Sequence, residues 1–308
     1  MRIGRFETRV RARIASRLDD AVRDYLRDGV LSNVDFAAPH GEPSLTAPNS
    51  VSWRIFKNPV SLFIGGVTAV LLEFAEPRVR TGVWDHSTFR VDPVTRMKRT
   101  GLAAMVTVYG ARSVAERMIA GVNRMHGRVA GVTPDGTPYT ATDPDLLAWV
   151  HATASFGFLE AYHTYVAPLS DADRDRFYAE GGAAAALYGV RERPQSVEEQ
   201  RAYFAAMTPK LERSDIVFEF HDIMRRVSAL PPPAQIAQRP LVRAAVDLLP
   251  ADVRDILGLD ASYGLRPLEG RLVRRMGKRA DLIILPSSPP AMACARLGLP
   301  KDYLIRRH

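Results

Sequence analysis

Three side chains that can bind an anion or a polar ligand are grouped near the start of one expected helix. Asp92 can cap the mainly apolar segment 92–110, which predicts a buried helix there. Arg96, Arg99 and Thr100 follow at spacings of three and four residues, which place them on one helix face. Cations are unfavourable in the first turns of a helix, because the positive end of the helix dipole lies there. These side chains therefore need a compensating anion or a polar pocket.

The compensating charge has two candidate sources. Four acidic residues lie close by in the sequence, and each could supply a carboxylate: Glu73, Glu76, Asp85 and Asp92. If none of them does, a bound ligand must take that place, because an unpaired buried charge is very costly. The residues alone leave both explanations open.

Two of the seven histidines fall within helices that the sequence predicts to be buried. His126 lies in VNRMHGRV, and His151 lies in LLAWVHATASF. A lone buried histidine is commonly a structural residue held by a hydrogen bond, but a neutral imidazole is also a good metal ligand. The single cysteine, Cys294, excludes a cysteine-rich metal cluster and an internal disulfide.

The motifs of several common enzyme classes are missing. The sequence contains no HExxH pair, no GxSxG elbow, no phosphate-binding loop and no Rossmann glycine pattern. Zinc hydrolases, serine hydrolases and nucleotide-binding enzymes therefore lose most of their support. The arginine–threonine cluster and the two histidines are the features that remain to be explained.

Helical signals dominate the chain, and we expect a mainly all-α protein built as a single helical-bundle domain. The exceptions are a turn-rich, hairpin-like loop over residues 131–143 and a short strand over 281–286. We divide the chain into an N-terminal helix and loop extension (1–50), a helical core (51–230) and a C-terminal extension that packs on the core (231–308).

The net charge of +8 and two basic amphipathic segments, residues 5–28 and 266–279, favour an anionic partner. No nucleic-acid-binding module surrounds either segment, so we expect no nucleic acid partner. Peripheral contact with an anionic membrane is an open alternative to a solvated surface. The most apolar run, 59–77, carries two glutamates and is shorter than the roughly 20 residues of a spanning helix. Because no export signal is recognisable, we expect a cytoplasmic protein.

Four segments, taken in order, resemble the bacterial and fungal haem-dependent oxygenases that include latex-clearing protein (rubber oxygenase) and the MpaB-type enzymes. The first is EPRVRTGVWDHSTFRVDPVTRMKRTG at 76–101, and the second is VNRMHGRVAG at 122–131. The third links Tyr139 to DPDLLAWVHAT at 143–153, and the fourth is AYHTYVAPLSDADRDRFYAE at 161–180. Their shared order and spacing make the resemblance specific.

The resemblance implies a helical fold with a globin-like core that binds haem b. It implies that His126 is the proximal ligand of the haem iron, with His151 as the second candidate. The distal side is then lined by the 92–110 helix, where Arg96 and Thr100 match catalytic positions of the family. Arg96 would also contact the cofactor.

Two positions depart from the family pattern. Arg99, expected to contact the cofactor, stands where latex-clearing protein has a lysine that can cap the iron. A guanidinium stays protonated and rarely coordinates a metal, so distal ligation must differ here. Rubber oxygenase also uses a glutamate one helix upstream as a catalytic base. Counting back from Arg96 places Arg80 at that position, with Glu76 one turn away, so rubber cleavage itself is not implied.

The resemblance and the residues together indicate a haem-b-dependent oxidoreductase that uses O₂ to oxidise a hydrophobic small molecule. Apolar walls for that substrate are expected on helix faces that carry Phe63, Leu71, Leu72, Met105 and Val108. The alternative is a non-catalytic haem- or lipid-binding helical protein, with or without contact to a membrane. The sequence indicates neither the substrate nor the oligomeric state.

Overall fold

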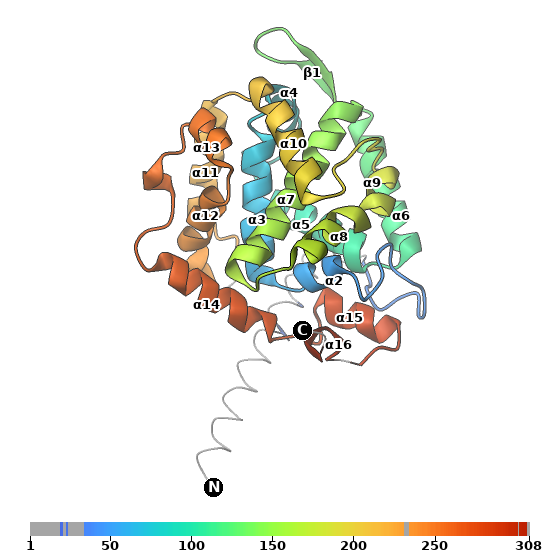
Figure 1. Ribbon diagram of the computed structural model, residues 1–308. Coiled ribbons are helices and arrows are strands. Elements are labelled where there is room, and N and C mark those ends of the chain that lie inside the picture. The colour runs from blue at the N-terminus through green and yellow to red at the C-terminus, as the bar shows by residue number, and fades with distance from the viewer. Residues whose placement is uncertain (1–18, 21–22, 24–33, 231–233, 301, 307–308) are drawn as a thin grey trace.

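The structure is a computed structural model that describes residues 19–20, 23, 34–230, 234–300 and 302–306. Helices make up most of this part of the chain, and a small two-stranded hairpin projects from one end (Figure 1). The mainly all-α fold class is therefore confirmed. The helix expected over residues 5–28 lies outside the described residues, except for positions 19, 20 and 23.

The elements follow one another along the chain with mostly short connections. The first half contains α2 (Val51–Phe56), α3 (Pro59–Glu73), α4 (Pro77–His86), α5 (Pro93–Tyr109), α6 (Arg112–His126), β1 (Ala130–Val132), β2 (Pro138–Thr140) and α7 (Pro144–Tyr165). The second half contains α8 (Asp171–Glu180), α9 (Gly182–Leu187), α10 (Val197–Met207), α11 (Asp215–Arg226), α12 (Gln238–Asp247), α13 (Ala251–Leu257), α14 (Glu269–Asp281), α15 (Pro289–Arg296) and α16 (Tyr303–Arg306). Short 3-10 turns lie at η1 (Thr208–Lys210), η2 (Ala234–Ala237) and η3 (Ala261–Tyr263).

Side-chain caps followed by proline set the start of the two central helices. Asn58 Oδ1 accepts hydrogen bonds from the backbone N–H groups of Val60 (3.1 Å) and Ser61 (3.2 Å) at the start of α3. Asp143 Oδ1 accepts from the N–H of Asp145 (2.9 Å) at the start of α7. A proline follows each cap at the first helical position, where its missing N–H costs nothing. These signals act over a few residues, so they do not depend on the rest of the fold.

One of the two expected exceptions to the helical pattern is confirmed and the other is wrong. The turn-rich loop over 131–143 does contain a hairpin, in which β1 pairs antiparallel with β2 and Gly131 lies opposite Tyr139. The strand expected over 281–286 does not form: α14 continues to Asp281, and a turn and irregular chain follow. Alternating apolar residues form a strand only where a neighbouring strand can pair with their backbone.

The most extensive helix–helix contact of the bundle joins α3 to α7, which lie side by side at its centre (Figure 1). A Cβ atom placed on Gly65 would lie 2.7 Å from the carbonyl oxygen of Gly157, and one placed on Gly157 would lie 2.4 Å from that of Gly65. Both distances are too short for any side chain. Glycine at these two positions lets the two backbones touch.

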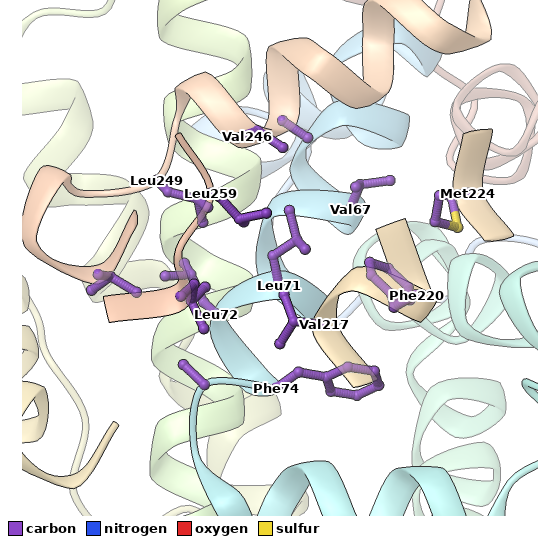
Figure 2. Packing of buried hydrophobic residues seen from close by; sticks show 14 of the residues in the cluster. Val67, Leu71, Leu72, Phe74, Val217, Phe220, Met224, Val246, Leu249 and Leu259 are labelled. Atoms are coloured by element: carbon purple, nitrogen blue, oxygen red, sulfur yellow. The ribbon is translucent and has the colours of Figure 1, made fainter. Parts of the chain in front are cut away.

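The C-terminal half of the chain covers the opposite side of α3. Figure 2 shows Leu71, Leu72 and Phe74 packed among buried side chains of α11 and of the segment around α12. Phe220 stacks edge-on against Phe74 with ring centroids 5.4 Å apart. Leu71 and Leu72 were expected to line a substrate pocket, but both are fully buried in this core.

None of the described helices is by itself long and apolar enough to cross a bilayer. The pair α3 and α4 meets that requirement by combined length and composition, although its two members are bent by 112° at the break between them. Most of α3 is buried within the bundle, as expected for the core helix of a folded domain.

The neighbouring glycines Gly65 and Gly66 provide a test of this packing. Gly65→Ala should lower the free energy of unfolding by about 1–3 kcal/mol, because its methyl group collides with the α7 backbone. Gly66→Ala should change it by less than about 1 kcal/mol, and in the stabilising direction, because alanine has the higher helix propensity. Urea denaturation of both variants measures the difference. Equal losses for the two variants would contradict the α3–α7 contact.

Candidate active site

The expected cap of the arginine-bearing helix is present. Asp92 Oδ1 accepts a hydrogen bond from the backbone N–H of Thr95 at 3.2 Å, and Pro93 is the first residue of α5. Hydrogen bonds from Thr95 lower the pKa of Asp92, and the charges of Arg99 and Lys98 lower it further. The ionised cap therefore offsets part of the positive charge at this end of the helix.

Arg96 and Thr100 form a local pair on one face of α5. The Thr100 hydroxyl donates to the carbonyl oxygen of Arg96 at 3.0 Å. Because a hydroxyl has one hydrogen, its oxygen is left to accept from the Arg96 guanidinium, and the two groups are within hydrogen-bonding distance. Burial lowers the pKa of Arg96, and the neighbouring charge of Arg99 lowers it further. Arg99 itself is exposed and forms no ion pair with any described residue.

Glu73, the last residue of α3, is the acid that faces Arg96. Burial raises the pKa of Glu73 to about 8, although the charge of Arg96 acts in the opposite direction. Within the described part of the chain, its carboxyl group has no hydrogen bond and no ion pair within 4.0 Å. Glu73 is therefore mainly protonated at neutral pH. The positive charge of Arg96 faces a neutral carboxylic acid rather than a carboxylate.

Glu76 and Arg80, the residues considered for the family's acid–base position, are engaged elsewhere. Glu76 is buried, caps α4 by accepting from the N–H of Val79 at 2.8 Å, and pairs with Arg78 at 2.7 Å. Arg80, at the position obtained by counting back from Arg96, donates to the carbonyl of Phe74 at 3.0 Å and pairs with Glu212. Neither faces α5 as a free acid or base.

The bend between α3 and α4 explains this difference from the expectation. The two helices meet at 112°, and the acid that interacts electrostatically with Arg96 is Glu73, at the end of α3. Counting residues back from Arg96 assumes that no such break intervenes. Glu73, considered at first only as a counter-ion, is the acid that the fold brings to the cluster.

The face of α3 that carries Glu73 is uncovered at one position. Gly66 lies seven residues before Glu73 and so on the same face of α3. A Cβ placed on Gly66 would meet no neighbouring segment within 4 Å. No described segment therefore covers this face of α3 at Gly66.

His126 lies at the end of α6 and lines a pocket of about 460 Å³. Burial lowers its pKa, and the charge of Arg96 lowers it further, so its imidazole is neutral at pH 7. No described residue shares a hydrogen bond with this imidazole. The pocket brings α6 together with α7 and α9, and its other lining residues include Asn123, Leu147 and Tyr188.

A hydroxyl pair connects this pocket to the arginine-bearing face of α5. Thr107 shares that face with Arg96 and Thr100, and its hydroxyl donates to the carbonyl of Ala103 at 2.7 Å. It must therefore accept from the Tyr188 hydroxyl, which lies 3.2 Å away. Burial raises the pKa of Tyr188, so this hydroxyl keeps its proton. No local pattern in the sequence pointed to either Thr107 or Tyr188.

Asn123 ties the same pocket wall to α6. Its side-chain amide donates to the carbonyl oxygen of Leu187, at the end of α9, at 2.8 Å. Together with the bond from Tyr188 to Thr107, this contact holds the end of α9 to two helices. The wall of the pocket is therefore fixed to α5 and α6.

His151 lies on α7 and faces the junction of α8 and α9. A Cβ placed on Gly181 would lie 3.6 Å from His151 Nε2. Burial lowers the pKa of His151 to about 4, with a further contribution from the charge of Arg193, so its imidazole is also neutral. Among the described residues it has no hydrogen-bond partner. The usual structural explanation of a buried histidine, a hydrogen bond to the protein, therefore applies to neither His126 nor His151.

The expected apolar walls lie in the hydrophobic core or at its edge. Phe63 and Met105 are half-buried, and each packs against one of the two core clusters. Val108 packs in the buried cluster around α2 and α15, and Leu71 and Leu72 face the C-terminal helices. Helices that are apolar on every side give no signal that separates a pocket wall from the core.

The raised pKa of Glu73 predicts a specific effect of pH on the cofactor-free protein. Between about pH 6 and pH 8 the folded state holds a proton that the unfolded state has lost, so this residue makes stability fall as pH rises. The slope is at most about 1.4 kcal/mol per pH unit, and less because Glu73 is only half-buried. Glu73→Gln should remove this term, so its stability relative to the parent should increase from pH 6 to pH 8. The exposed residue Glu116 provides the control, and Glu116→Gln should show no such trend.

Comparison with known proteins places this site in a family. A family model described as "ER-bound oxygenase mpaB/B'/Rubber oxygenase, catalytic domain" matches residues 53–280, which include the helices that carry the site. Searches of curated proteins and of solved structures found no match. Because the family model covers most of the chain, this protein belongs to the family of mpaB and rubber oxygenase catalytic domains, which are oxygenases.

Proposed function

We propose that this protein is a haem-b-dependent oxygenase that uses O₂ to oxidise a hydrophobic small molecule. The observation that carries the proposal is the charge of Arg96. It interacts electrostatically with Glu73, whose pKa burial raises to about 8, and it has no carboxylate within 4.0 Å among the described residues. Oxygenase activity follows from the family. The cofactor and the substrate class are implied by the resemblance to haem-dependent oxygenases, and these residues are compatible with them.

The donor set fits an iron porphyrin better than a bare metal ion. No group of three or more His, Cys, Asp or Glu residues in the described chain could hold a metal ion. Haem iron needs only one or two protein ligands, and a neutral histidine is a common one. His126 would hold the iron, with His151 as the second candidate, since both imidazoles are neutral and unbonded.

The cations also fit this cofactor. Haem carries two propionate groups, and a guanidinium makes strong charge-assisted hydrogen bonds to a carboxylate. Arg96 and the exposed Arg99 could each donate hydrogen bonds to a haem propionate or to a polar group bound beside the haem. When bound, haem supplies the one-electron and O₂ chemistry that side chains lack.

The remaining steps belong to the protein. Arg96, held in place by Thr100, can donate hydrogen bonds to negative charge that develops on the reacting atoms. Glu73 holds a proton on its carboxyl group with a pKa close to neutral, so it can give or take a proton at the working pH. We therefore assign the family's acid–base role to Glu73 and assign Arg96 and Thr100 to charge stabilisation.

The alternative of a non-catalytic haem- or lipid-binding protein explains an open apolar region equally well. It gives no role to Glu73, whose pKa is close to neutral, or to the nearby Arg96 guanidinium, which is hydrogen-bonded to Thr100. Pairs of this kind are typical of sites that move protons. The oxygenase is therefore the function that we favour.

Haem binding can be tested by absorbance. Protein reconstituted with haem should show a Soret band and a histidine-ligated spectrum. His126→Ala should abolish or shift that spectrum, while His40→Ala, a change at an exposed histidine, should leave it intact. If only His151→Ala abolishes the Soret band, the iron ligand is His151 on α7. A protein that takes up no haem would refute the proposal.

The role of Glu73 can be tested by oxygen uptake. The haem-loaded protein should consume O₂ in the presence of an unsaturated hydrocarbon such as squalene, supplied in detergent. Glu73→Gln should lower the rate by about a hundredfold without loss of the Soret band, because general acid–base catalysis contributes about 10²–10⁴-fold. If Glu73 acts as a base, the parent rate should rise with pH up to about pH 8. Glu116→Gln should match the parent.

A further inference from the structure

The outward face of α14 has no partner among the described elements. Val273, Gly277 and Asp281 face inward, and Gly277 approaches α7 so closely that an added Cβ would lie 2.4 Å from the carbonyl of Tyr165. Figure 1 shows α14 along the end of the molecule where α15 and α16 also lie. One face of α14 is thus fixed to the bundle, and the other faces solvent.

The solvent-facing side of α14 is strongly basic. Its exposed cations are Arg271, Arg274, Arg275, Lys278 and Arg279. None of them forms an ion pair with a described residue. Several are spaced four residues apart, an arrangement in which like charges destabilise a helix. The exposed face of α14 therefore carries positive charge that no described acidic residue neutralises.

Both acidic residues of α14 are turned away from this surface. Glu269 pairs with Arg243 of α12 at 2.7 Å, and buried Asp281 pairs with Lys57 at 3.1 Å. The basic face is left without internal neutralisation. A solvated salt-bridged helix would instead mix both signs on its exposed side.

Large apolar side chains are exposed among these cations. Leu272 lies on the helix and is 48% exposed, and Leu268 just before it is 71% exposed. Leu282 and Ile283 follow the helix and are 66% and 48% exposed. Half of the exposed large apolar residues in the described chain therefore belong to this one segment. We call residues 268–283 the basic–apolar patch.

The N-terminal region approaches the same end of the protein. The Asp19 carboxylate accepts from the backbone N–H of Ser287 at 2.8 Å, and Arg23 Nε donates to the Ser287 hydroxyl at 3.3 Å. Ser287 lies four residues beyond the patch. The sequence before Asp19 is rich in arginine, including Arg9, Arg11 and further members of the basic segment.

We propose that the basic–apolar patch binds the surface of an anionic lipid bilayer. Exposed cations are attracted to anionic headgroups, and exposed leucine and isoleucine side chains leave water when they enter the headgroup–acyl boundary. A nucleic acid or an acidic protein surface would also attract the cations. It would provide no comparable free-energy gain from burying the four exposed apolar side chains. This inference is independent of the proposed haem chemistry.

Co-sedimentation of the full chain with vesicles tests the proposal. The protein should bind vesicles of phosphatidylglycerol and phosphatidylcholine in equal parts, and should bind pure phosphatidylcholine vesicles far less. Arg275→Gln combined with Lys278→Gln should weaken binding by about tenfold or more. Leu272→Ser combined with Leu282→Ser should weaken it comparably, although the charge is unchanged.

Matched controls separate the patch from general charge and from misfolding. Arg201→Gln with Lys210→Gln removes two exposed cations elsewhere, and Val91→Ser removes an apolar side chain that is 89% exposed. Both control proteins should bind like the parent, and circular dichroism should show that all variants are folded. Equal weakening by the control and patch variants would overturn the proposal, as would the absence of vesicle binding. If both patch double variants still bind vesicles like the parent, another segment must bind the membrane, and the proposal is overturned.

A fluorescent label distinguishes insertion from adsorption. Leu272→Cys can be labelled with an environment-sensitive dye, because Cys294, the native cysteine, is 1% exposed and should not react. Anionic vesicles should shift the emission to the blue, whereas double-stranded DNA should not. A shift with DNA but none with vesicles would show that the patch binds nucleic acid instead.

Discussion

The backbone contact between α3 and α7 is the constraint on which the rest of the structure depends. Gly65 turns toward α7 and allows the two helices to touch, whereas its neighbour Gly66 turns toward open space. One helix therefore serves two purposes. Its Gly65 face anchors the bundle, and its Gly66 face, which ends at Glu73, borders the candidate active site.

The electrostatics of that site follow from the same arrangement. Burial removes part of the hydration of Glu73 and raises its pKa to about 8, so this carboxyl group holds its proton at neutral pH. Arg96 stays charged, since a guanidinium keeps its proton even where burial lowers its pKa. The imidazoles of His126 and His151 are neutral for the same reason of burial.

Much of this could be predicted from the sequence, and the misses have physical causes. Caps such as Asp92 act within three residues, so the start of α5 could be predicted from the sequence. Glu73 was assigned only as a counter-ion, because the bend after α3 cannot be read from a residue count. Tyr188 reaches Thr107 across 81 positions, and such a contact leaves no local signal.

The mismatch of charge between Arg96 and Glu73 has a consequence for selectivity. At neutral pH the region between α3 and α5 contains a guanidinium cation and a neutral acid, so its electrostatic potential is positive. If the proposed site lies there, amines and other cationic compounds should be disfavoured, while compounds with negatively charged or electron-rich groups should be favoured. Ionisation of Glu73 at alkaline pH would remove this discrimination, so the range of accepted compounds should depend on acidity as well as on shape.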